Sequence, residues 1–125
     1  MRALIVDDSS TMRSVLRMIL RGLQIETFEA GNGAQALEQV KKVPDLDFAL
    51  VDWNMPQMNG FEFLCAVRYE HSYDLMKVIM VTTETELTQV QQALLRGANE
   101  YIMKPFTRDS VIEKLQLLGL VPQTV

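Results

Sequence analysis

Five strand-like segments alternate with five helix-like segments along the chain, and no linker rich in proline, glycine or serine separates them. Such alternation predicts one parallel sheet with helices on its faces, because parallel strands need long crossover connections that are usually helical. The segments at 2–6, 48–52 and 77–82 are mainly apolar, as expected for strands covered on both faces. The segments at 26–30 and 100–103 are mixed or short, so we place them at the edges.

The handedness of the connections limits the possible strand orders. Right-handed crossovers permit the order 2-1-3-4-5, so the predicted fold class is α/β, a doubly wound five-stranded parallel sheet of the flavodoxin-like type. The first helix is the clearest, since hydroxyl side chains precede an apolar stripe with helical spacing. This stripe consists of Met12, Val15, Leu16, Ile19 and Leu20. The later helices are expected at 34–42, 61–69, 87–96 and 108–118.

The overall composition excludes several classes of protein. A chain of 125 residues can form one domain with a substantial core, and its net charge of −4 argues against nucleic-acid binding. No apolar run approaches the ~18 residues that a membrane span needs. The N-terminus is unlike a signal peptide, so we expect a cytoplasmic protein without membrane contact. The single cysteine, Cys65, excludes an internal disulfide and a cysteine-based metal site.

Polar side chains stand at the ends of four of the predicted strands. Asp7 and Asp8 follow the first strand, Asp52 ends the third, Thr82 ends the fourth and Lys104 follows the fifth. These groups should meet in the crevice where the winding direction of the sheet switches. Two like unit charges ~4 Å apart at an effective dielectric of ~20 repel by about 4 kcal/mol, so three carboxylates require a cation. Oxygen ligands select a hard ion, and we predict Mg²⁺ together with the Lys104 ammonium.

Each of these groups also has an ordinary structural explanation. An aspartate after a strand can cap a helix or open a turn, a threonine can cap, and a lysine can lie on the surface. Four such groups at neighbouring strand ends are hard to explain as caps. A metal-bound carboxylate beside a lysine and a hydroxyl suits phosphoryl transfer, which needs mainly positioning and charge neutralisation. We predict Asp52 as the in-line nucleophile that becomes an acyl phosphate, with Lys104, Thr82 and Mg²⁺ each holding one phosphoryl oxygen.

The motifs around these residues resemble the receiver domain of two-component response regulators. The resemblance covers essentially the whole chain and rests on ALIVDDSSTMR (3–13), VDWNMP (51–56), MNG (58–60), VT (81–82) and KPF (104–106). It implies one receiver domain over 1–125, with no output domain after Val125. The order 2-1-3-4-5 is known for this family, so it is not an independent derivation. The implied function is a signalling switch rather than an enzyme, with Mg²⁺-dependent self-phosphorylation from a phosphodonor and autodephosphorylation.

The resemblance implies a role for each residue of the predicted site. Asp52 is similar to the phosphoacceptor, and Asp7 and Asp8 are similar to the acidic pair that holds Mg²⁺ directly or through water. Asn54 lies where a backbone carbonyl completes the metal shell in the family. Lys104 is similar to the lysine that contacts the phosphoryl group.

The resemblance also implies a conformational switch and a means of resetting it. Thr82 is similar to the switch hydroxyl and Tyr101 to the switch aromatic, which turns inward when Thr82 moves to the phosphoryl group. Asn54 and Glu84 occupy positions that modulate dephosphorylation, beside the path of the attacking water. The peptide bond before Pro105 is implied to be cis.

The implied partners are proteins. A histidine kinase or phosphotransfer domain would donate the phosphoryl group, and a downstream target would bind the face built from the fourth helix, the fifth strand and the fifth helix. We take Gln89, Gln92, Tyr101 and Arg108 as candidate contacts on that face, and we expect a monomer. The pathway stays open between chemotaxis or motility and a single-domain phosphorelay or stress-response regulator.

Two other classes of protein share part of this pattern. A phosphatase of the haloacid dehalogenase type also uses an aspartyl nucleophile with Mg²⁺, but it needs an aspartate two residues later, where this chain has Asn54. A flavodoxin-like electron carrier needs a hydroxyl- and glycine-rich loop after the first strand. Asp7 and Asp8 stand there and would repel a flavin phosphate. A yellow colour of the purified protein would identify the flavin carrier.

Overall fold

The computed structural model describes residues 1–83 and 87–124. The strands are β1 (Arg2–Val6), β2 (Glu26–Ala30), β3 (Phe48–Asp52), β4 (Lys77–Thr83) and β5 (Glu100–Lys104). The helices are α1 (Ser10–Gly22), α2 (Gly33–Lys42), α3 (Gly60–Tyr69), the 3-10 helix η1 (His71–Tyr73), α4 (Leu87–Leu95) and α5 (Arg108–Leu117). All paired strands are parallel, and the sheet order β2-β1-β3-β4-β5 confirms the predicted order.

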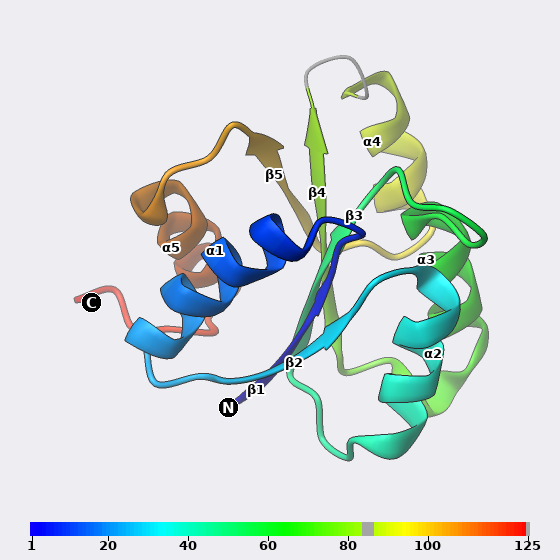
Figure 1. The fold of residues 1–125 in the computed structure, drawn as a ribbon, viewed down its shortest axis with the longest axis horizontal. Helices are drawn as coiled ribbons and strands as arrows, with labels where there is room; N and C mark the ends of the chain where they lie inside the picture. Colours follow the sequence, from blue (N-terminus) through cyan, green and yellow to red (C-terminus); the bar gives the residue numbers. More distant parts are fainter. Residues whose placement is uncertain (84–86, 125) are drawn as a thin grey trace.

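The sheet separates two apolar cores, because successive side chains of a strand point to opposite faces. Figure 1 shows α1 and α5 on one side of the sheet and α2 and α3 on the other. In β1, Leu4 and Val6 join the core under α2, α3 and α4, whereas Ala3 and Ile5 join the core under α1 and α5. None of these four side chains is more than 1% exposed. The central strands are apolar except at their ends, because both of their faces are covered.

Side-chain caps determine where most helices begin. Four helices follow a residue whose side chain accepts a backbone N–H of the first turn, namely Ser9, Asn32, Asn59 and Thr107. Asn59 forms a capping box, in which its own N–H donates to the Glu62 carboxylate at 3.0 Å. These caps explain why α2 and α3 begin at Gly33 and Gly60, one residue earlier than the apolar spacing predicts.

Some details of the sequence prediction were wrong. Val15, which the prediction assigns to the buried stripe of the first helix, is 41% exposed. It lies about 100° around the helix from Leu16, at the margin of the face that packs on the sheet. Residues 71–73, between the segments expected as a helix (61–69) and a strand (77–82), form η1. The helices α4 and α5 each end one residue earlier than predicted, and β4 and β5 each extend one residue further.

Two glycines let the loop after β3 lie close to its neighbours. A Cβ on Gly60 would overlap the main-chain oxygen of Asp52, and the Gly60 N–H donates to the Trp53 oxygen at 2.9 Å. A Cβ on Gly33 would lie 2.6 Å from the Met58 side chain, and the Gly33 N–H donates to the Met58 oxygen at 3.0 Å. The loop is therefore held against the carboxyl end of β3 at Gly60 and against the start of α2 at Gly33.

Gly60→Ala should lower the free energy of unfolding by about 1–3 kcal/mol, because the new methyl group must displace the main chain of Asp52. Gly22→Ala is the matched control, since a Cβ at that last residue of α1 meets nothing within 4 Å. Alanine there restricts the unfolded chain, so stability should stay constant or rise by up to about 1 kcal/mol. Urea denaturation measures both variants, and equal stabilities would contradict the close approach at Gly60.

Candidate functional site

The carboxyl ends of neighbouring strands bring most of the predicted site residues together. Asp52 is the last residue of β3 and lies opposite Val81 of β4, so Thr82 stands one step beyond it. Lys104 is the last residue of β5 and lies opposite Thr83. Asp7 directly follows β1. Because the strands are parallel and in this register, these side chains lie at one edge of the sheet, as the sequence predicts.

Three carboxylates form a cluster at this edge. One oxygen from each of Asp7, Asp8 and Asp52 can be chosen so that all three lie within 4.8 Å of one another. Asp7 and Asp52 are buried, at 2% and 8% exposure, whereas Asp8 is exposed. The Ser9 N–H donates to Oδ1 of Asp7 at 2.9 Å and orients that carboxylate. A cluster of carboxylate oxygens fits a hard divalent cation, so these residues suit the metal ion that the sequence predicts.

Lys104 supplies a positive charge inside the site. Its Nζ lies 3.0 Å from Oδ1 of Asp52 and 3.5 Å from Oδ2 of Asp7. Burial alone lowers the pKa of Lys104, but the hydrogen bond to Asp52 and the charges of Asp52 and Asp7 outweigh it and leave the pKa above its ordinary value. The ammonium therefore stays charged between the two carboxylates. The peptide bond between Lys104 and Pro105 is cis, as the resemblance implies.

The protonation of Asp52 is strongly perturbed. Burial is the main cause and raises the pKa of Asp52 from 3.8 to about 6. The hydrogen bond from Lys104 lowers this pKa, while the charges of Asp7 and Asp8 raise it. The ionised form of Asp52 is therefore disfavoured in the folded protein until a further cation compensates the three carboxylates.

The predicted switch residues lie on β4 and β5. Thr82 is fully buried, and its hydroxyl donates to the main-chain oxygen of Thr83 at 3.3 Å. Tyr101 is half-buried and packs against the core under α2, α3 and α4. The Nζ of Lys114 lies 4.6 Å from the centroid of the Tyr101 ring. The coupling between Thr82 and Tyr101 stays a prediction.

The loop after β3 places two further residues near the site. Asn54 is exposed, and its predicted roles in metal binding and dephosphorylation stay predictions. Trp53 is 7% exposed and stacks on Phe61 with 5.6 Å between the ring centroids. Because Trp53 adjoins Asp52 in the chain, its fluorescence should report events at the site. Glu84 lies outside the described residues, and its role also stays a prediction.

Arg13 is a residue of the site that the sequence reasoning missed. Its Nη1 donates to the main-chain oxygen of Asp7 at 2.6 Å. Its Nε donates to Glu29 at 3.2 Å, and Glu29 also pairs with Arg17 at 2.6 Å. The guanidinium is thus held in place and steadies the main chain that carries Asp7. Helical spacing assigns Arg13 only to the polar side of the first helix, because a bond to a backbone oxygen six residues away leaves no periodic signal.

Comparison with known proteins gives consistent matches. The family described as response regulator receiver domain matches residues 3–116. The chain is 44% identical over 117 residues to the chemotaxis protein CheY homolog of Campylobacter jejuni, which covers 93% of this chain and 90% of that protein. It is 40% identical over 119 residues to chemotaxis protein CheY1 of Helicobacter pylori, and the alignment covers 94% of this chain and 96% of that protein. The solved structure of CheY4 from Vibrio cholerae has a TM-score of 0.86 at 34% identity, over 93% of this chain and 96% of that one.

The fold and the site define a CheY-like α/β domain whose carboxyl edge carries an acidic cluster and a lysine. Because the family match spans most of the chain and relatives share more than a third of its residues, the chain belongs to the response regulator receiver domain family. The resemblance seen in the sequence motifs is thereby confirmed. Among the described residues, no helix has the length and apolar character needed to cross a membrane.

Arg13→Gln should weaken Mg²⁺ binding about tenfold, because groups that orient metal ligands typically contribute this much to affinity. Arg17→Gln is the matched control, since Arg17 contacts Glu29 and Ser14 but makes no bond to Asp7. Titration of Mg²⁺ followed by Trp53 fluorescence measures both. If the two substitutions weaken binding equally, the bond from Arg13 to Asp7 does not orient the site.

Asp52→Asn should stabilise the protein by about 1–3 kcal/mol at neutral pH in the presence of a chelator. The pKa of Asp52 is raised to about 6 on folding, so the folded state binds more protons and wild-type stability falls as the pH rises from 3.8 through about 6. The difference in free energy of unfolding between the variant and the wild type should therefore reach its full value above pH 6 and vanish below pH 3.8. Urea denaturation across this range tests it, and a constant difference at every pH would contradict the assignment.

Proposed function

We propose that this receiver domain is a phosphorylation switch in which Asp52 accepts a phosphoryl group from a histidine kinase or phosphotransfer domain. The observation that carries the proposal is a buried Asp52 carboxylate with Lys104 at 3.0 Å and two further aspartates able to share a cation with it. The protein acts on its own side chain, so it is a signalling protein and not an enzyme with a separate substrate. We place it in the cytoplasm as a monomer.

The chemistry proposed for Asp52 is an in-line displacement. One carboxylate oxygen attacks phosphorus and forms a P–O bond while the P–N bond to the donor histidine breaks and the imidazole leaves with the electron pair. Lys104 binds one phosphoryl oxygen, and the Thr82 hydroxyl donates to another. When bound, Mg²⁺ would neutralise charge on the phosphoryl group, and its proposed ligands are Asp7, Asp8, Asp52 and the Asn54 carbonyl.

Hydrolysis of the acyl phosphate would reset the switch. Water attacks phosphorus, and the P–O bond to Asp52 breaks to regenerate the carboxylate. We propose that Asn54 and Glu84 set the lifetime of this state, because they lie two residues after Asp52 and Thr82. An unchanged phosphoryl half-life in both Asn54→Ala and Glu84→Ala would contradict this role.

The names of the relatives favour one pathway. Curated proteins 40–44% identical to this chain are described as chemotaxis proteins, so we propose a role in chemotaxis or motility. A phosphorelay or stress-response role is the alternative. Comparing the rates at which candidate kinases phosphorylate the protein would distinguish the two.

Acetyl phosphate should label Asp52 alone, because only this carboxylate combines a buried strand end with Lys104 and the acidic cluster. Mass spectrometry should find one acid-labile phosphoryl group in the wild type, and none in Asp52→Asn or in the presence of a chelator. Asp109→Asn is the matched control, since Asp109 is an exposed aspartate in the first turn of α5. Undiminished labelling of Asp52→Asn would contradict the proposal that Asp52 is the phosphoacceptor.

We expect a target protein to distinguish the two states of the switch by binding the face formed by α4, β5 and α5. Gln89, Gln92 and Arg108 are exposed there, beside the half-buried Tyr101. Beryllofluoride, a phosphoryl mimic, should raise the affinity of a target for this face by the usual allosteric coupling of ~1–3 kcal/mol. Tyr101→Ala should abolish most of that gain in a binding titration. An equal gain in wild type and variant would show that Tyr101 does not couple the site to this face.

A further inference from the structure

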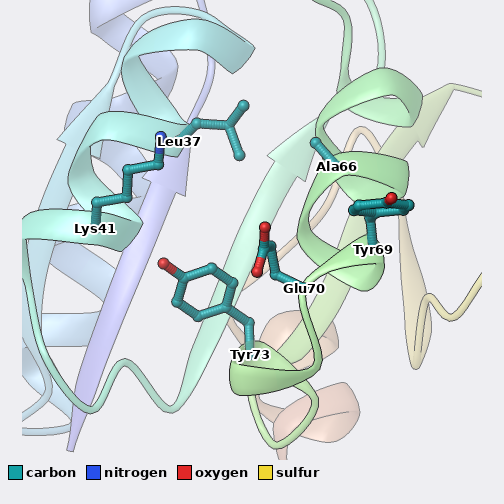
Figure 2. Close-up of a pocket in the computed structure, with 6 residues that line it drawn as sticks. All are labelled: Leu37, Lys41, Ala66, Tyr69, Glu70 and Tyr73. Atoms are coloured by element: carbon teal, nitrogen blue, oxygen red, sulfur yellow. The ribbon is translucent and has the colours of Figure 1, made fainter.

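Three adjoining hollows run across α2, α3 and α4, on the side of the sheet opposite α1 and α5. The first, of about 500 Å³, is lined by Leu37, Lys41, Ala66, Tyr69, Glu70 and Tyr73 (Figure 2). The second, of about 300 Å³, is lined by Cys65, Arg68, Tyr69, Leu95 and Arg96. The third is lined by Gln91, Leu94 and Leu95. Tyr69 and Leu95 are shared between neighbouring hollows, so the three form one continuous surface, which we call the α3–α4 patch.

Large apolar side chains are exposed on the α3–α4 patch. Tyr69 is 84% exposed, Leu95 87% and Leu94 43%. A single exposed apolar side chain is ordinary, but several that line adjoining hollows mark an interaction surface. Leu94 and Leu95 lie three and four residues after Gln91 and share its side of α4. Leu94 lies five residues after Gln89 and about 140° around α4 from it, whereas Leu95 lies only three residues after Gln92. The patch therefore adjoins the candidate switch contacts at Leu95 and extends from there toward α3.

Arg68 is a cation of the patch that forms no ion pair with any carboxylate in residues 1–83 and 87–124. Its guanidinium donates four hydrogen bonds of 2.7–3.0 Å, to the main-chain oxygens of Gly97, Tyr73 and Met76 and to the amide oxygen of Asn99. All four acceptors are neutral. Burial lowers the pKa of Arg68, and the charge of Asp74 offsets only part of that effect. A carboxylate of a partner that approaches this charge would therefore meet no competing ion pair among the described residues.

The patch is basic on a protein that is acidic overall. Lys41, Arg68 and Arg96 line the three hollows, and among the described residues Glu70 is their one carboxylate. Asp45 lines a further hollow that shares Tyr73 with the first. None of these three cations forms an ion pair with a carboxylate in the part of the chain that the structure describes. The whole chain carries a net charge of −4. The positive charge of the α3–α4 patch therefore favours an acidic partner.

Charge and shape together select the kind of partner. A second copy related by a two-fold axis would place the basic patch against itself, which like charges oppose. Nucleic acid and anionic membranes need a larger basic surface and would meet the negative field of the rest of the chain. An amphipathic helix suits the patch better, because its apolar side chains can enter adjoining hollows while its carboxylates face the arginines.

We infer that the α3–α4 patch is a docking site for an acidic amphipathic segment of another protein. Such a segment buries apolar side chains against Tyr69 and Leu95 and places carboxylates near Arg68 and Arg96. The inference goes beyond the proposed switch and does not depend on phosphorylation of Asp52.

The probe is a helical peptide with leucines on one face and flanking glutamates, titrated into the full ¹⁵N-labelled chain. Amide signals of 65–70 and 91–97 should shift, and the same peptide with glutamine in place of glutamate should bind about tenfold more weakly. Tyr69→Ser and Arg96→Glu should each reduce the affinity about tenfold, as expected at the centre of an interface. Met18→Ser is the matched control, since Met18 is 74% exposed on α1 and should leave the affinity unchanged.

Several outcomes would overturn the inference. One is that millimolar peptide shifts no signals in these segments. Others are that the glutamine peptide binds equally well, or that Met18→Ser weakens binding as much as Tyr69→Ser. Tyr69-dependent sedimentation with phosphatidylglycerol vesicles would assign the patch to a membrane instead. Tyr69-dependent dimers in sedimentation velocity would assign it to a second copy.

Discussion

Repulsion among the carboxylates at the carboxyl edge of the sheet is the constraint around which the site is organised. Asp7 and Asp52 are almost fully buried, and one oxygen from each lies within 4.8 Å of an oxygen of Asp8. Lys104 relieves part of this repulsion, yet burial still raises the pKa of Asp52 to about 6. The site therefore keeps an electrostatic cost that a divalent cation relieves, which links a metal ion physically to the chemistry proposed for Asp52.

The two apolar cores hold this unfavourable arrangement in place. Every residue of β3 is buried, because side chains of this strand enter both cores. The loop after β3 is held against the strand at Gly60 and against α2 at Gly33, and Arg13 steadies the main chain at Asp7. The buried Asp7 and Asp52 cannot move apart without disturbing packed elements, so the free energy of core burial opposes relaxation of the site.

The helix α4 contributes to two surfaces of different chemistry. It packs on the sheet through Val90 and Ala93, which are 4% and 0% exposed. Its exposed surface carries the glutamines of the proposed switch face and the leucines of the α3–α4 patch, and the two adjoin at Gln92 and Leu95. Because both surfaces include one helix, partners at the two surfaces affect each other's affinity if α4 shifts between states that they bind differently. The proposed switch face and the α3–α4 patch are therefore neighbours on one helix, and the features of the patch do not involve Asp52.

The sequence by itself determined the parallel sheet and the meeting of the carboxylates with Lys104, while the strand order also rested on the resemblance to the receiver family. Apolar strands and alternating helices specify a parallel sheet, and parallel strands share one carboxyl edge. Only the tertiary structure decided that Arg13 bonds to Asp7, that Val15 is exposed and that Tyr69 and Leu95 line one surface. These features depend on how segments distant in the chain pack against each other, and such packing leaves no periodic pattern in the local sequence.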